Sequence, residues 1–284
     1  MDFALGIIMT LVGTTINSVG ILLQKLDINR SGMKDDSNLS YFMKRPVWVL
    51  GILMQTIILL PFFILGIDLL GVTLAQPLAT AGLLVFVLGS IFVLKEKLKR
   101  QEWAGVIMLV VAVLLIGLSG VVGDVTMAVF FQESFLANLI IFLVITAGLV
   151  VVGIIVIKVL EKQVLGYSIF LGVAYAIVSI SGQLATPPLD MMFGTGLSAA
   201  GWILLLLGVA GVLLGTYFGI LYSQLAFQKG QAIDVVPSSQ AIINLLPVFA
   251  GLFLFGQYIL FPVLFIAGMG LLLVSVVLLA RFQK

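Results

Sequence analysis

Two polar stretches, each built around a proline, interrupt long apolar runs of this sequence, at residues 76–80 and 236–240. A proline inside a helix removes one backbone donor and frees the carbonyl of the preceding turn. In apolar surroundings that carbonyl and the polar side chains beside it need neighbours, water or a solute. The pattern therefore indicates solute binding, with kinks and hydrogen bonds between helices as the alternative. The candidate substrate-binding residues here are Gln76, Pro77, Thr80, Pro237, Ser238, Ser239, Gln240 and Asn244.

Three further polar residues are candidates because they lie within or near apolar segments. Asn17 and Gln183 are predicted to line the same path, since amide side chains in lipid seek partners inside the bundle or a wet cavity. Asp234 is the most inward acidic residue and the one candidate metal ligand. Its alternative role is an acidic residue near a helix N-terminus, where the helix dipole stabilises negative charge.

Composition limits the chemistry that the chain can perform. It has no Cys and no His, which excludes disulfides, thiolate metal sites, Ser–His–Asp triads and imidazole relays. We find no nucleophile–base pair, HExxH motif, paired carboxylates or ATP-binding loop, so we expect neither an enzyme nor a cofactor. No carboxylate is expected inside the bundle, so no proton relay is apparent. A net charge of +2 offers no surface for nucleic acid.

The elements that must position these residues are membrane-spanning helices. Of the 284 residues, 62% are hydrophobic and 9% charged, against roughly 25% charged in soluble domains. A spanning helix needs about 20 mostly apolar residues. Gly211, Gly215 and Gly219 predict close packing of one helix against another. The nine predicted spans are 3–25, 47–67, 72–94, 103–121, 135–158, 167–185, 201–226, 231–255 and 259–280.

The basic residues give the orientation of these spans. All fourteen fall on one side of the predicted membrane, and the opposite side carries only acidic charge. Because positive charge marks cytoplasmic loops, we expect an N-terminus outside, a cytoplasmic C-terminus and a multi-pass protein of the plasma membrane. The N-terminus lacks a positive n-region, so the first span is expected to remain as a helix. The basic residues are Lys25, Arg30, Lys34, Lys44, Arg45, Lys95, Lys97, Lys99, Arg100, Lys158, Lys162, Lys229, Arg281 and Lys284.

An odd number of spans allows an inverted repeat, the plan of many transporters. The predicted fold is an all-α polytopic helical membrane protein with about nine transmembrane helices and a 4+5 inverted repeat. The first repeat covers residues 1–121, a connecting helix 122–164 and the second repeat 165–284. A shift of 160 positions aligns Pro77 with Pro237, and Asn17 is a candidate match for Gln183.

The third predicted span and its exit resemble the drug/metabolite transporter superfamily. The residues that carry the resemblance are 73–78 and Leu94-Lys95-Glu96-Lys97-Leu98. The nine-span plan, the segment 21–25 and the segment 222–227 resemble its NIPA-like magnesium transporter branch more than its EamA-like branch. The second half has Gly256-Gln257 where many relatives place a glutamate. The resemblance implies a transporter and suggests Mg²⁺ as substrate.

The sequence therefore predicts a secondary transporter that moves a small solute by alternating access, with Mg²⁺ as the candidate substrate. A neutral or zwitterionic metabolite fits the uncharged path at least as well, because Mg²⁺ favours hard oxygen ligands that usually include carboxylates. A non-transporting membrane scaffold or accessory subunit is the alternative from another class. The expected partners are the lipid bilayer and the solute or Mg²⁺, and a homodimer stays open.

Overall fold

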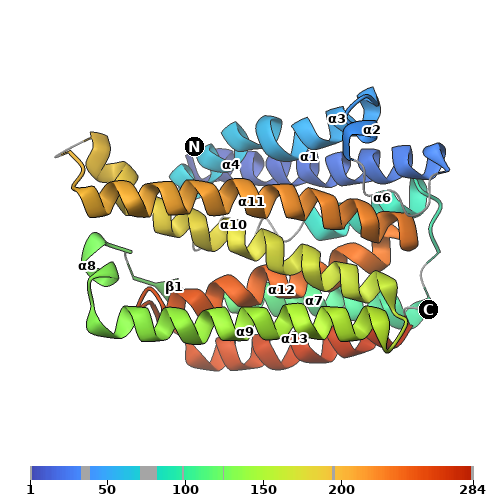
Figure 1. Cartoon of the computed structure of the whole chain (residues 1–284). Coiled ribbons are helices and arrows are strands. Elements are labelled where there is room, and N and C mark those ends of the chain that lie inside the picture. The colour runs from blue at the N-terminus through green and yellow to red at the C-terminus, as the bar shows by residue number, and fades with distance from the viewer. Residues whose placement is uncertain are drawn as a thin grey trace. The chain divides into compact units, whose positions relative to one another are not determined.

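The chain folds almost entirely into α-helices in the computed structural model, which describes residues 2–32, 39–70, 82–97, 99–123, 125–193 and 196–282 (Figure 1). The only strands in this part of the chain are two residues long. In chain order the elements are α1 (Asp2–Ser31), α2 (Leu39–Phe42), α3 (Pro46–Leu53), the π-helix η1 (Met54–Ile58), α4 (Leu59–Leu70), α6 (Gly82–Phe92), α7 (Arg100–Leu118), β1 (Val121–Val122), α8 (Met127–Phe130), α9 (Glu133–Lys158), α10 (Gln163–Phe193), α11 (Ala199–Lys229), α12 (Ala232–Phe253), β2 (Tyr258–Ile259) and α13 (Pro262–Phe282).

The helices have the length and composition of membrane segments, which confirms the all-α membrane class. Among the described residues, five helices are long and apolar enough to cross a bilayer: Phe3–Ser31, Glu133–Lys158, Gln163–Met192, Ala199–Lys229 and Ala232–Phe253. Shorter apolar helices lie in the other four predicted ranges, at Pro46–Phe62, Gly82–Phe92, Trp103–Leu118 and Pro262–Ser275. That these four also cross the membrane, which would give nine spans, stays a prediction.

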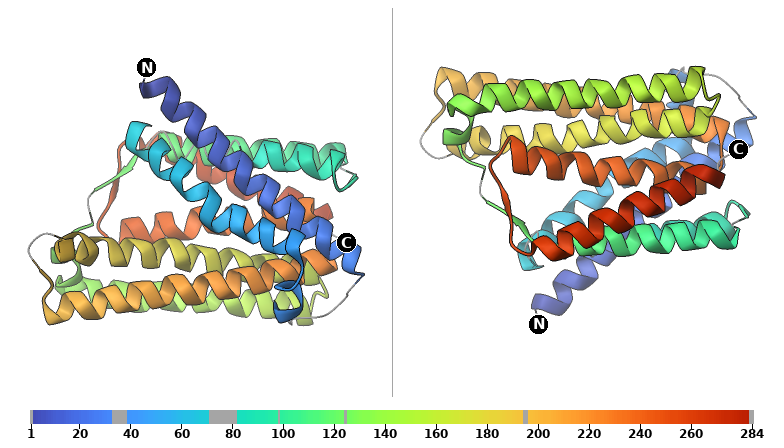
Figure 2. Two further views of the ribbon diagram at one scale, coloured as in Figure 1. Left: turned by 90° about the horizontal axis from the view of Figure 1, so that it is seen from above. Right: turned by 90° about the horizontal axis from the view of Figure 1, so that it is seen from below.

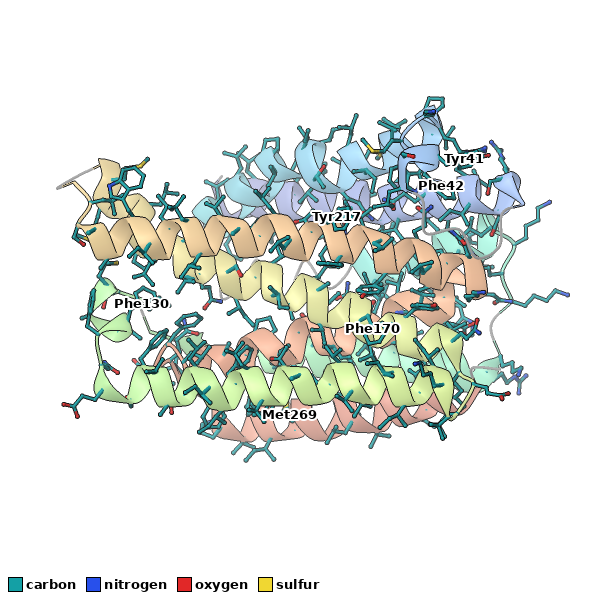
Figure 3. The ribbon with its side chains drawn as sticks, in the orientation of Figure 1. Tyr41, Phe42, Phe130, Phe170, Tyr217 and Met269 are labelled. Atoms are coloured by element: carbon teal, nitrogen blue, oxygen red, sulfur yellow. The ribbon has the colours of Figure 1, made fainter. Side chains whose placement is uncertain are left out.

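Large apolar side chains cover the outside of several helices (Figure 3). On α9, five of the six residues from 140 to 145 are leucine, isoleucine or valine side chains that are more than half exposed. Water would not tolerate an apolar surface of this extent on a single soluble chain. Lipid does, so the protein is a helical membrane protein.

The chain forms two compact units, and each is described by itself. Unit 1 comprises Met1–Gly120, Gln224–Pro237 and Phe261–Lys284. In it α1 packs against α3, α4 and α6, and α7 lies beside α13 (Figure 2). Two buried serines join these helices: Ser18 Oγ donates to the carbonyl of Gly82 at 2.7 Å, and Ser275 Oγ donates to that of Gly105 at 2.8 Å.

Unit 2 comprises Val121–Ser223 and Ser238–Leu260, with α9 packed along α10. Its core brings Phe142 of α9 and Ala176 of α10 together with Leu246, Ala250 and Leu254 of α12. Strand β1 pairs with β2 in antiparallel fashion, with Val121 opposite Ile259. Helices that are distant in sequence therefore share one apolar core.

Glycines of α11 lie directly against α10, which confirms the predicted close packing. A Cβ atom added at Gly211 would lie 2.2 Å from Ser181 Oγ, and one at Gly215 would lie 2.9 Å from the carbonyl of Ala174. At Gly219 the nearest atom would be Tyr175 Cε1, at 2.9 Å. No side chain larger than hydrogen fits at these positions unless a neighbouring side chain or, at Gly215, a backbone carbonyl shifts.

The boundaries of the two units differ from those of the predicted repeat because the units follow contacts and not chain order. Unit 1 takes in both ends of the chain together with the 224–237 segment. The repeat at 1–121 and 165–284, with its connector at 122–164, remains a prediction about topology.

Candidate functional site

The polar stretch of α12 is mostly buried. Pro237, Ser238 and Ser239 have little solvent exposure, and both serines have interaction partners. Gln240 and Asn244 are half-buried one turn apart, and Asn244 Nδ2 donates to the backbone carbonyl of Gln240 at 2.7 Å and to its Oε1 at 3.2 Å. Pro237 has no N–H, so it cannot donate to the carbonyl of Ile233 as a helical residue would. The stretch therefore interrupts the hydrogen bonding of α12 and joins two amides in one pair.

Gln183 lies on α10, far along the helix from the polar stretch of α12. The two helices meet where a Cβ at Gly172 would lie 3.0 Å from the carbonyl of Ser239. Gln183 is eleven residues farther along α10, a rise of about 16 Å. Ala176, nearer to Gly172, already packs with Leu246 and Ala250. The structure thus spreads the unit 2 candidates along two packed helices and does not gather them in one place.

Oxygen atoms of Gln183 and of the next residue lack their usual hydrogen-bond donors. Its Oε1 is buried and accepts no hydrogen bond from any described residue. Pro187 and Pro188 lie inside α10, which continues to Phe193. Neither proline has an N–H, so the carbonyls of Gln183 and Leu184 lack their usual helical donors. Asp190, an exposed acid, follows within one turn. The two prolines end the predicted span at 185, but they are also the sequence signal for this break in hydrogen bonding.

Asn17 is half-buried on α1, next to the buried Ser18. Its predicted neighbours Gln76, Pro77 and Thr80 lie outside the described residues. Their grouping with Asn17, and the match of Asn17 with Gln183, therefore stay predictions.

The structure gathers charged residues of unit 1 around the turn that joins α11 to α12. Lys25 of α1 is 5% exposed, and its Nζ donates to the carbonyl of Gly230, at 2.6 Å, and to that of Phe227. Glu96, which follows α6, is 8% exposed. Its Oε1 accepts the backbone N–H of Ala232 at 2.8 Å, and its Oε2 accepts that of Ile233 at 3.0 Å. We call Lys25, Glu96 and the 227–233 segment that they hold the Lys25–Glu96 clamp.

The charges of the clamp complement the two helix ends. The last carbonyls of α11 carry partial negative charge and meet an ammonium group, and the first N–H groups of α12 carry partial positive charge and meet a carboxylate. Asp234, in the first turn of α12, lies within electrostatic reach of Lys25. Burial raises the pKa of Glu96, whereas the hydrogen bonds from Ala232 and Ile233 and the charge of Lys25 lower it, and the net shift is upward.

A second buried acid lies near the same end of α1. Asp27 is paired with Arg45, whose Nη2 donates to Asp27 Oδ1 at 3.0 Å and whose Nη1 donates to the Tyr41 hydroxyl at 3.2 Å. Figure 3 labels Tyr41 on the short helix α2. The expectation that the bundle encloses no carboxylate was wrong: Asp27 and Glu96 are both buried, because backbone and side-chain donors satisfy them.

Buried amide atoms of two glutamines in unit 1 have no hydrogen-bond partner among the described residues. Gln224 of α11 is 1% exposed, and neither its Nε2 nor its Oε1 is hydrogen-bonded to a described residue. Gln24 of α1 is 2% exposed, and its Nε2 is equally unpartnered in that part of the chain. Buried polar groups are normally satisfied, so these two amides are the natural partners of water or a polar solute.

No described residues form a cluster of three or more His, Cys, Asp or Glu side chains that could hold a metal ion. Asp234, which lies within electrostatic reach of Lys25, is therefore not part of such a cluster among the described residues. No family model, curated protein or solved structure matches the chain.

Proposed function

We propose that this chain is a secondary transporter that moves a small solute across the membrane by alternating access. The observation that carries the proposal is the interrupted hydrogen bonding of α10 at Gln183, with a buried side-chain oxygen and two backbone carbonyls that have no helical donors. In a spanning helix, such irregular backbone is tolerated where it lines a cavity or a path for a solute.

The available atoms define the chemistry of the solute. Carbonyl and amide oxygens are hydrogen-bond acceptors and ligands for hard cations. Mg²⁺ is the first candidate, and it would move largely hydrated, since Mg²⁺ gives up its water reluctantly and the described residues supply no cluster of acids. Amide atoms without a hydrogen-bond partner among the described residues favour a second candidate, a neutral or zwitterionic metabolite with donors and acceptors of its own. They are Gln24 Nε2, Gln183 Oε1 and both amide atoms of Gln224.

The test is flux into liposomes that contain the purified protein. A Mg²⁺-sensitive dye inside reports Mg²⁺ uptake with and without an inside-negative potential, and radiolabelled zwitterions are assayed in parallel. Moving a divalent cation inward gains about 4.6 kcal/mol at 100 mV, so potential should accelerate Mg²⁺ uptake.

Two variants with matched controls locate the path. Gln183→Leu removes the unpartnered oxygen, and Gln132→Leu, at an exposed residue before α9, is its control. Pro187→Ala supplies an N–H to the carbonyl of Gln183, and Pro262→Ala, at the first residue of α13, is its control. We expect the two α10 variants to lower the initial rate by about tenfold, or about 1.4 kcal/mol, and the controls to leave it unchanged. Folded protein that moves neither solute class would disprove the proposal.

A further inference from the structure

The 224–237 segment carries the end of α11, the turn and the start of α12. The chain passes from unit 2 into unit 1 at Gln224 and returns to unit 2 after Pro237. The remaining parts of both helices belong to unit 2. Whatever holds this segment in unit 1 therefore decides whether the ends of α11 and α12 move with unit 1 or with the helices that continue from them.

Two buried charged side chains of unit 1 hold the segment. Lys25 binds two carbonyls on the α11 side of the turn, and Glu96 binds two N–H groups on the α12 side. All four partners are backbone atoms, so the side chains of the turn do not determine the contact. Lys95 and Lys97, which flank Glu96, are exposed. Of these three neighbouring charged residues, the buried one is Glu96, whose negative charge suits the N-terminus of a helix.

The balance of forces in the clamp suits a reversible contact. Hydrogen bonds to charged groups are stronger than those between neutral groups. Burial of an ammonium and a carboxylate, however, removes most of their hydration, which opposes the closed arrangement. On opening, both groups regain water and the helix ends regain solvent as a partner. The two arrangements are thus closer in free energy than the number of hydrogen bonds suggests.

Pro237 lies where the segment leaves unit 1. Its missing N–H removes one hydrogen bond of α12 directly after the turn that Glu96 holds. Sharp kinks of helices occur at prolines more than at other residues. The clamp and Pro237 therefore lie at the two ends of the first α12 turns, with Asp234 between them.

We infer that Lys25 and Glu96 are positioning residues that hold the α11–α12 turn closed. The turn opens, with Pro237 as the hinge, when their hydrogen bonds to the turn break. This inference rests on the proposed function: in the transport cycle, the clamp is the element that closes the cytoplasmic end of the solute path. The closed arrangement is the one in this structure. A variant that lacks either side chain populates the open arrangement more often.

The chain has no cysteine, so one introduced cysteine can report opening. Ile233 is 3% exposed and its N–H is held by Glu96, so Ile233→Cys places a thiol under the clamp. Its rate of reaction with N-ethylmaleimide is measured in detergent-solubilised protein, without solute, alone and combined with Glu96→Ala or Lys25→Met. We expect each combination to accelerate labelling by about tenfold or more, as expected for easier local opening.

Two controls separate opening from other effects. Lys97→Ala changes an exposed neighbour of Glu96 and should leave the labelling rate of the Ile233 cysteine unchanged. Ala176→Cys reports on the fully buried core of unit 2 and should stay protected in every variant. An unchanged rate at position 233 overturns the inference. Equal acceleration at 233 and 176 also overturns it, because the two residues would then only keep the whole fold intact.

The same variants distinguish this inference from the proposed function. If Glu96→Ala and Lys25→Met accelerate labelling at position 233 but the unchanged protein moves no solute into liposomes, the clamp inference stands and the transporter proposal fails. If solute moves and the labelling rate does not respond to Glu96→Ala, the clamp fails and the transporter proposal stands.

Discussion

The carboxylate of Glu96 accepts the backbone N–H of Ala232 at 2.8 Å across 136 positions of sequence. The contact satisfies one of the N–H groups that every helix leaves without a partner at its start. It ties the segment after α6 to the beginning of α12, and the same side chain also binds Ile233.

Loss of this carboxylate should destabilise the protein. Glu96→Ala leaves two buried N–H groups without acceptors, so we expect a loss of about 1–3 kcal/mol of unfolding free energy. The measurement is denaturant or thermal unfolding in detergent micelles. Lys97→Ala, at the exposed adjacent residue, should change it little. Equal stability of the two variants would mean that water replaces Glu96 at no cost.

The pH dependence of stability should carry a contribution from Glu96. Burial raises its pKa above the ordinary 4.5, so the folded protein binds this proton more readily than the unfolded chain does. The resulting stability is present in full below pH 4.5 and is lost as the pH rises through the raised pKa. We expect the free-energy difference between the unchanged protein and Glu96→Gln to vary with pH in that direction. A difference that is constant between pH 4.5 and neutrality would contradict the upward shift.

Helix positions were largely predictable from the sequence, since an apolar run of spanning length has few other ways to satisfy its backbone in lipid. The ends of the helices were less so. The first predicted span ends at Lys25, but α1 continues to Ser31 and so encloses the charge. The sixth ends at 185, before Pro187, but α10 continues to Phe193. In both cases the helix continues past the local signal.

The clamp could not be predicted because its partners are backbone atoms. A carbonyl of Phe227 or an N–H of Ala232 has no signature in the sequence, and only the fold brings them to Lys25 and Glu96. The local backbone that positions Glu96 is also visible only in the structure. Lys95 has a left-handed backbone with φ of 57°, and the N–H of Glu96 returns to the carbonyl of Ser90 at 3.1 Å.

The same helix ending recurs at Gly256, where φ is 64° and the N–H of Gln257 reaches the carbonyl of Gly251 at 2.9 Å. Glu96 and Gln257 thus share a backbone geometry and differ in side-chain charge, although the shift of 160 that aligns the two prolines pairs Glu96 with Gly256. Gln257 uses its amide to donate to the carbonyl of Gly123 at 3.0 Å. The ending also occurs after α9, at Glu161, so it does not by itself mark a repeat.

Close packing of α11 on α10 should make Gly215 intolerant of a methyl group. A Cβ there would lie 2.8 Å from Val178 Cγ2 and 2.9 Å from a backbone carbonyl, so one helix must shift. We expect Gly215→Ala to cost about 1–3 kcal/mol of unfolding free energy, as overpacking does. Gly148→Ala, on an exposed face of α9 with open space around it, is the matched control and should not destabilise. If the two variants unfold alike, the helices have room that the structure does not indicate.

The predicted orientation can be measured with single cysteines in this cysteine-free chain. Three exposed residues lie in connections between helices whose side the charge pattern predicts. Lys97 is predicted to lie inside, and Gln132 and Tyr258 are predicted to lie outside. In intact cells, a membrane-impermeant maleimide should label Gln132→Cys and Tyr258→Cys. It should label Lys97→Cys only after permeabilisation, because basic loops stay in the cytoplasm. Gln132 and Tyr258 flank the segments from α9 to α12, so labelling of both from outside requires an even number of crossings between them. Labelling of Lys97→Cys in intact cells would reverse the orientation, and with it the assignment of the Lys25–Glu96 clamp to the cytoplasmic end.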